Sequence, residues 1–218
     1  MGINKGAPWG KPVCGPPDVT VEGDDATLAR AAAGHPGARI ALTPRPAADF
    51  ARAIGLSSAD PTTELLCDGL NVAVGQRNLF AVNMVVLGTP PDRQRWWSRV
   101  TRVRVRVDDR VVHDGAALAV VVANGQFLRG LDVVPRGHPG DGRVEVQVYA
   151  LAPRERAAMR SRLALGTHVP HPRIRSAAGR RVEIHVERPV AVEIDGADSG
   201  SAGDVDVTVV AGAFSLLV

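Results

Sequence analysis

Hydrophobic and polar positions follow two different patterns along the chain, and the first of them covers the N-terminal quarter. Two short apolar runs predict strands, and each is followed by a segment with helical spacing: 18–21, 27–34, 38–42 and 47–55. The helical segments end at Gly34 and Gly55, as helices often do. This alternation of strand and helix predicts a small αβ unit.

From residue 70 onward, apolar residues recur at every second position, which is the spacing of half-buried strands. In 100–107, for example, Val103, Val105 and Val107 share one face of the expected strand. The same pattern predicts further strands at 79–87, 117–123, 143–149, 181–187, 189–195, 205–210 and 213–218. One helix is expected at 153–164.

Together the two patterns predict an α/β plus β fold, in which an αβ lobe packs on a larger antiparallel β-sandwich lobe. We place the boundary near residue 60, which gives lobes of 1–60 and 61–218. A cleft between the lobes is the expected place for function.

Composition and charge narrow the class of protein. The chain has 26 basic and 23 acidic residues, and its arginines alternate with acids instead of forming a stripe, which argues against a nucleic-acid partner. No apolar run reaches the length of about 18 residues that a membrane span requires, and the start lacks the apolar core of a secretion signal. Cys14 and Cys67 lack metal-ligand spacing. We therefore expect a cytoplasmic protein with reduced thiols.

Acidic side chains gather where the first strand meets the first helix, at Glu22, Asp24 and Asp25. Ligands of αβ sheets bind at the carboxyl ends of strands, and crowded carboxylates raise one another's pKa, so this cluster is a candidate for acid–base catalysis. The structural alternative is a solvated turn that complements the helix dipole. Asp195 and Asp198 form a second acidic pair, which is either catalytic or part of a turn.

Aromatic, basic and histidine residues give further candidates. Trp96 and Trp97 either wall an aromatic substrate pocket or cap the core. The arginines of 100–107 either face solvent or meet an anionic lipid or phosphate. His168 and His171 have no third ligand nearby, so no metal site is expected.

A series of short segments adds information beyond these patterns: 49–56, 80–88, 122–125, 135–142, 171–172, 192–196 and 209–213. In their order and spacing they resemble the motifs of the diacylglycerol kinase-like lipid kinase family. The resemblance covers roughly residues 18–56 and 68–218. It implies the two-lobe fold of that family, with a shrunken αβ lobe here. Asn83 and Asn124 stand at two of its asparagine positions and are candidates for substrate binding.

The chain departs from this family where the family handles ATP. The phosphate loop Gly-Gly-Asp-Gly-Thr is replaced by 23–27 (GDDAT), which puts the carboxylate of Asp24 where a phosphate would sit. The second nucleotide loop, Gly-Thr-x-Asn-Asp-Phe, aligns with 45–50, where Arg45 becomes a candidate for substrate binding. The family's Asp-Gly-Glu, whose glutamate is the implied base, ends here in Ala197.

We therefore expect a repurposed enzyme that works without ATP and without a cofactor. Its cleft carboxylates would carry out acid–base catalysis on a small organic substrate, for instance an amine–carbonyl condensation of Pictet–Spengler type in secondary metabolism. Two alternatives stay open: a non-catalytic pseudokinase that binds lipid or protein, and a residual lipid kinase with Asp25 on Mg²⁺. No nucleic-acid partner and no membrane span are expected, and the chain is a candidate homodimer.

Overall fold

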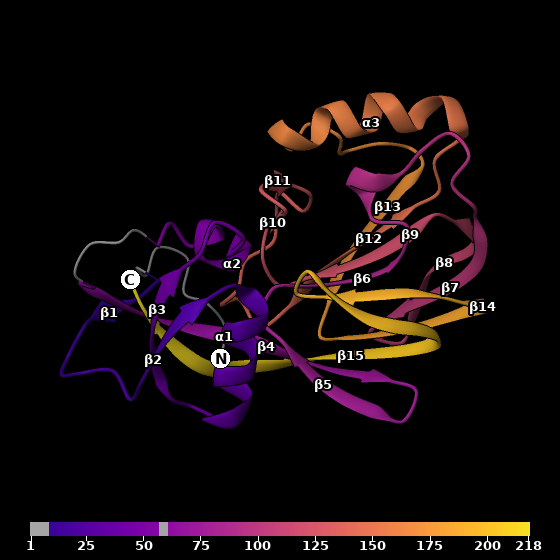
Figure 1. The fold of residues 1–218 in the computed structure, drawn as a ribbon. Helices are drawn as coiled ribbons and strands as arrows, with labels where there is room; N and C mark the ends of the chain where they lie inside the picture. Colours follow the sequence, from indigo (N-terminus) through magenta and orange to yellow (C-terminus); the bar gives the residue numbers. More distant parts are fainter. Residues whose placement is uncertain (1–8, 57–60) are drawn as a thin grey trace.

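The computed structural model describes residues 9–56 and 61–218 (Figure 1). The strands are β1 Lys11–Pro12, β2 Val19–Gly23, β3 Arg39–Pro44, β4 Thr63–Val74, β5 Arg77–Ala81, β6 Met84–Gly88, β7 Thr101–Val107, β8 Arg110–Ala117, β9 Ala119–Ala123, β10 Phe127–Leu128, β11 Leu131–Asp132, β12 Val144–Tyr149, β13 Ile174–Gly179, β14 Arg181–Ile194 and β15 Ala197–Leu217. The α-helices are α1 Asp25–Gly34, α2 Asp49–Ala53 and α3 Arg156–Arg162, and the 3-10 helices are η1 Pro91–Arg93, η2 Pro153–Glu155 and η3 Leu163–Leu165. None of these helices is long and apolar enough to cross a membrane.

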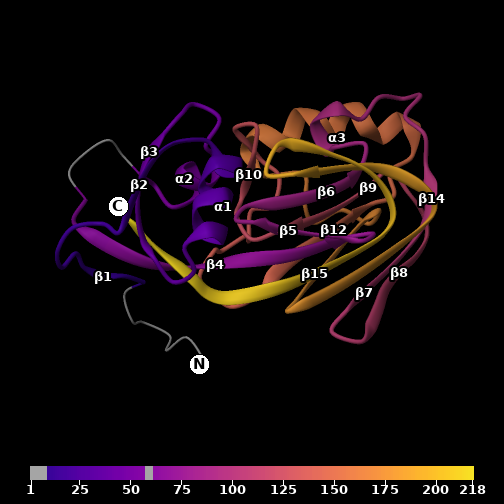
Figure 2. The same ribbon diagram turned by 60° about the horizontal axis from the view of Figure 1, so that its bottom comes forward.

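Two long strands, β4 and β15, run from the sandwich into the αβ part of the molecule (Figures 1 and 2). They pair with each other in antiparallel fashion, with a bulge between Val210 and Phe214. Gly212, within this bulge, has a φ of 60°, a conformation that glycine adopts without strain. Beyond the bulge, the end of β15 pairs with β3 in parallel. The bulge therefore allows one strand to belong to both packing units.

The αβ unit combines α1, α2, β2 and β3 with the outer ends of β4 and β15. Its core consists mainly of buried apolar side chains from these elements, including Leu28, Ile40, Phe50, Phe214 and Leu216. The last residues of the chain thus complete the core of the lobe that we expected over 1–60, of which 1–8 and 57–60 lie outside the described residues.

The sandwich places its valines between two layers of strands. β14 joins the layers, because it pairs with β7 over Val182–Val186 and with β6 over Val192–Ile194. Figure 2 shows β14 curving around one end of the sandwich in this way. The predicted alternation holds here, since the three valines of β7 are all buried in the main core. The expected α/β plus β architecture is confirmed.

Several predicted element boundaries are wrong for identifiable reasons. The strand predicted at 79–87 is two strands, because Val82 and Asn83 leave the sheet and donate their N–H groups to Asp195. The two strand pairs predicted after residue 180 are the continuous strands β14 and β15, because register shifts absorb each interruption. β13 was not predicted, since its sequence lacks an apolar alternation.

Candidate active site

A cavity of about 190 Å³ lies where the αβ unit meets the sandwich. In Figure 1, α1, α2 and β10 converge at this junction. The cavity is lined by Asp24, Asp25, Ala26, Ala47, Asp49, Asn83, Arg93, Leu128, Arg129, Asp195, Gly196 and Ala197. Because these residues come from segments far apart in the sequence, the cavity is a product of the tertiary fold.

Asp25, the first residue of α1, is a buried carboxyl in the wall of this cavity. Its side chain is held by two donors: the N–H of Phe50, at 2.9 Å from Oδ1, and Nδ2 of Asn83, at 2.7 Å from Oδ2. Burial, followed by the nearby negative charge of Asp195, raises the pKa of Asp25 to about 8. The group therefore carries its proton at neutral pH, although both hydrogen bonds favour the ionised form.

Asp195 lies in the β14–β15 turn at a φ of 49°, a left-handed conformation that aspartate tolerates better than most residues. Its carboxylate accepts the backbone N–H groups of Val82, Asn83 and Met84 at 2.8–2.9 Å, which closes the gap between β5 and β6. Burial raises the pKa of Asp195 to about 6, and these three hydrogen bonds oppose the rise. At neutral pH Asp195 is therefore mainly ionised, beside the protonated Asp25.

Asp49 and Arg129 hold the β10 segment against α2. The carboxylate of Asp49 accepts the backbone N–H groups of Arg129 and Gly130. The guanidinium of Arg129 donates to both oxygens of Asp92, at 2.7 and 2.9 Å, and to Glu193 at 2.5 Å. The charge of Arg129 is thus neutralised within the protein.

Asp24 caps the N-terminus of α1. Its Oδ1 accepts the backbone N–H and the hydroxyl of Thr27, at 2.9 and 2.8 Å, and these bonds lower the pKa of Asp24. A carboxylate therefore occupies the helix end at which a bound phosphate would find its N–H donors.

The structure brings Asp24, Asp25, Asn83 and Asp195 together around the cavity. Asn124 is fully buried nearby, but its Nδ2 donates to the backbone carbonyls of Asp68 and Val82, so it supports the fold.

The other predicted site residues do not line the cavity. Glu22 and Arg45 form an exposed ion pair at 3.4 Å. Asp198 is exposed and accepts the N–H of Gly200 within its turn. Trp96 and Trp97 lie on the surface, 71% and 62% exposed, so they neither wall this cavity nor cap the core.

Sequence reasoning did not select Asp49, Arg93 or Arg129, which the structure adds to the lining. Asp49 aligns with the aspartate of the second nucleotide loop, Gly-Thr-x-Asn-Asp-Phe, and this alignment could have pointed to it. Nothing in the local sequence marks Arg129, because its partners lie on distant segments. In the part of the chain that the structure describes, no group of three His, Cys, Asp or Glu side chains is arranged to hold a metal ion.

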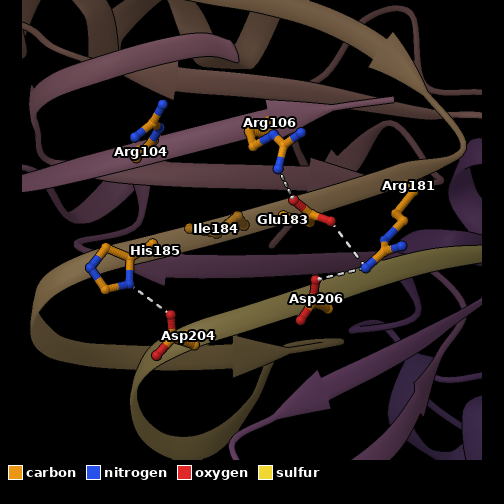
Figure 3. Close-up of a pocket in the computed structure, with 8 residues that line it drawn as sticks. All are labelled: Arg104, Arg106, Arg181, Glu183, Ile184, His185, Asp204 and Asp206. Atoms are coloured by element: carbon orange, nitrogen blue, oxygen red, sulfur yellow. Dashed lines mark hydrogen bonds and ion pairs between the residues drawn. The ribbon is translucent and has the colours of Figure 1, made fainter. Parts of the chain in front are cut away.

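A second hollow, of about 310 Å³, lies on the outer face of the sandwich and contains part of the arginine row of β7 (Figure 3). Arg106 and Arg181 lie 3.1 and 3.0 Å from the carboxylate of Glu183. His185 lies 2.7 Å from Asp204. Exposed pairs of this kind contribute little energy and are screened by solvent. The hollow is therefore a mixed-charge solvent-facing surface, whereas the first cavity is lined by the buried carboxyl groups of Asp25, Asp49 and Asp195.

Comparisons with known proteins agree with this architecture. The family model described as the YegS C-terminal NAD kinase beta sandwich-like domain matches residues 94–218. A diacylglycerol kinase from Bacillus anthracis str. Sterne is 16% identical, with a TM-score of 0.68 over 92% of this chain and 76% of that one. Yeast NADH kinase in complex with NADH is 12% identical, with a TM-score of 0.52 over 92% of this chain and 61% of that one. An NAD kinase from Archaeoglobus fulgidus in complex with ATP is 14% identical, with a TM-score of 0.52 over 92% of this chain and 78% of that one. No curated protein sequence matches the chain.

The fold of the chain, with its β-sandwich, is thus shared with the diacylglycerol kinase and NADH kinase neighbours. The family match covers more than half of the chain. The chain belongs to the diacylglycerol kinase-like lipid kinase family.

Proposed function

We propose that the chain is an enzyme that uses Asp25 as a general acid, and then as a general base, on a small organic amine without ATP. The observation that carries this proposal is the pair of buried carboxyl groups, Asp25 and Asp195, in the wall of one cavity, where burial raises the pKa of both. Paired carboxyl groups with separated pKa values are typical of acid–base sites. A pKa of about 8 keeps the proton on Asp25 at neutral pH and near the optimum for transfer.

The N-terminus of α1 supports a reaction without ATP. The charge of Asp24 at this helix end would face a phosphate, and two like charges about 4 Å apart repel by about 4 kcal/mol at an effective dielectric constant of about 20. The cavity arginines do not offset this charge, because Asp92 and Glu193 lie within 4.0 Å of both of them. A triphosphate therefore fits this cavity poorly, whereas a protonated amine would be attracted.

The acid–base steps of a Pictet–Spengler-type condensation of an arylethylamine with an aldehyde need only such groups. The aromatic wall that we expected for this reaction is not found among the residues that line the cavity, so the aryl ring would lie against its aliphatic side chains. The bound ammonium ion first releases a proton to water, and the free amine adds to the aldehyde. Asp25 then gives its proton to the resulting hydroxyl group, and water leaves to form an iminium ion. The aromatic carbon then attacks the iminium carbon, and the carboxylate of Asp25 takes up the ring proton. The cycle consumes no oxidant, and the negative charge of Asp195 would stabilise the cationic intermediate.

The test compares two aspartate variants. Purified protein is incubated with a small arylethylamine and acetaldehyde, and the cyclised product is measured by mass spectrometry. We expect Asp25→Asn to lower the rate at least about 100-fold, the usual contribution of a general acid or base. Asp198→Asn, which changes an exposed carboxylate outside the cavity, should stay within about twofold of the original.

The arylethylamine used in this assay need not be the natural substrate. Binding measurements therefore test the proposal independently of turnover. Calorimetry should give no binding heat with ATP and Mg²⁺, and weak binding of an arylethylammonium ion that Asp24→Asn reduces further. Transfer of labelled phosphate from ATP to a glycerolipid, or unchanged amine binding in Asp24→Asn, would overturn it.

A further inference from the structure

The segment between η1 and β7 exposes an unusual amount of aromatic surface. We call residues 93–100 the tryptophan loop. Trp96 and Trp97 are 71% and 62% exposed and meet edge to face, with ring centroids 5.3 Å apart, and Val100 is 50% exposed beside them in the sequence. Tryptophan is on average well buried in folded proteins, so two adjacent exposed rings mark an interaction surface.

The backbone of the tryptophan loop is held firmly, so this exposure does not result from a loose segment. Gln94 is fully buried, and its Nε2 donates to the carbonyl of Thr89 at 3.1 Å. Arg156, a buried residue of α3, donates from Nη1 to the carbonyls of Arg95, Trp96 and Ser98, each at 2.9 Å. The buried guanidinium of Arg156 thus fixes the loop backbone in a conformation that leaves both tryptophan rings on the surface.

The exposed charges beside the rings that lack an ion-pair partner in the described part of the chain are positive, whereas the nearby acids Asp92 and Glu155 are paired with arginines. Arg95 and Arg99 flank the rings, both are exposed, and neither has a carboxylate within ion-pair distance among the described residues. The neighbouring η2 and α3 add the exposed Arg154 and Arg162, which also lack such a partner in the described part of the chain. Figure 1 shows α3 lying along the outer edge of the molecule, where it is accessible to a large flat partner.

We propose that the tryptophan loop, with the adjoining arginines of α3, docks on an anionic lipid surface. Tryptophan prefers the headgroup region of a bilayer, where its ring is apolar and its N–H stays hydrated. Arginines beside it would meet the phosphates of anionic lipids. Exposed tryptophans and arginines are also typical of protein interfaces. Unpaired charges of one sign match an anionic lipid surface, and binding to a protein instead is an outcome of the test below. The attachment is peripheral and rests on side chains alone.

The experiment uses two kinds of vesicle and the intrinsic fluorescence of the loop. The sequence contains three tryptophans, so in a Trp9→Phe variant the tryptophan fluorescence comes from Trp96 and Trp97 alone. The test vesicles contain phosphatidylcholine with about 30% phosphatidylglycerol, which gives them a negative surface potential. The protein should sediment with these vesicles. Its tryptophan emission should shift to the blue and be quenched by brominated lipid. These effects should be much smaller with vesicles of phosphatidylcholine alone.

Variants then separate the aromatic from the charged contribution. Trp96→Ala with Trp97→Ala should abolish sedimentation, and Arg95→Ala or Arg99→Ala should each lower the partition coefficient roughly fivefold. Arg110→Ala, an exposed arginine of the β7–β8 hairpin, is the matched control and should leave binding unchanged. If no more protein sediments with anionic vesicles than without vesicles, the proposal is overturned. This result is expected if the loop contacts a protein instead. Binding that survives the double tryptophan change would also overturn the proposal.

Discussion

Replacing Asp25 with asparagine tests whether this buried carboxyl is held in its protonated form. Asparagine preserves the shape of the side chain and the oxygen that accepts the N–H of Phe50 at 2.9 Å. Its amide would face Nδ2 of Asn83, but Oδ1 of Asn83 is buried and has no hydrogen-bond partner among the described residues. Turning over the Asn83 amide offers that oxygen as an acceptor, in exchange for the bond that Nδ2 donates to the carbonyl of Phe127 at 3.1 Å, a loss of about 1 kcal/mol. The variant is therefore expected to fold.

The magnitude follows from the pKa of Asp25, which rises from 3.8 to about 8 on folding. Between these values the folded protein binds this proton more tightly than the unfolded chain does. The free energy of unfolding therefore falls as the pH rises through this range, and the fall levels off above about pH 8. At about 1.4 kcal/mol per pH unit, the loss between about pH 6 and pH 9 is about 3 kcal/mol. Asparagine does not titrate, so the variant lacks this loss.

The assay is urea denaturation of the original protein and of Asp25→Asn at pH values of about 6 and 9. The original protein should lose about 3 kcal/mol more than the variant between the two conditions, or roughly 6–12 °C in melting temperature for a chain of this size. Asp198→Asn, which changes an exposed carboxylate, should keep the original pH dependence. Parallel pH profiles for the original protein and Asp25→Asn would refute the reasoning, because Asp25 would then be ionised at neutral pH.

Two further substitutions test the packing and capping around the same site. A Cβ added at Gly125 would lie 2.3 Å from Oδ1 of Asn83, so Gly125→Ala should lower the free energy of unfolding by about 1–3 kcal/mol. The control is Gly34→Ala, which should be nearly neutral because a Cβ at Gly34 would have no atom within 4 Å. Equal melting temperatures for these two variants in calorimetry would contradict the close approach at Gly125. Asp24→Ala removes the cap on the N–H of Thr27 and should cost about 1 kcal/mol in urea denaturation, and a variant as stable as the original would show that the cap is dispensable.

Local patterns were sufficient to predict much of the sandwich and the presence of the αβ unit. The valines of β7 alternate in the sequence because one face of that strand is buried, and this relation needs no knowledge of the partner strands. The motifs from 80 onward likewise indicated the family, and the match over 94–218 confirmed it. β5 and β6 were predicted as one strand. The residue that separates them, Asp195, lies more than 100 positions away in the sequence, so no local pattern indicated the break.

The contrast between Asp24 and Asp25 shows what the sequence alone determined and what it left to the tertiary structure. The sequence placed both carboxyl groups at the start of α1, because capping and strand–helix order are local properties. Which of the two keeps its proton was decided by segments that fold around them: Phe50 and Asn83 bury Asp25, while Asp24 stays partly exposed with Thr27. The pKa of a group depends on its burial and on charges within a few ångströms, and those neighbours arrive only when distant parts of the chain pack together.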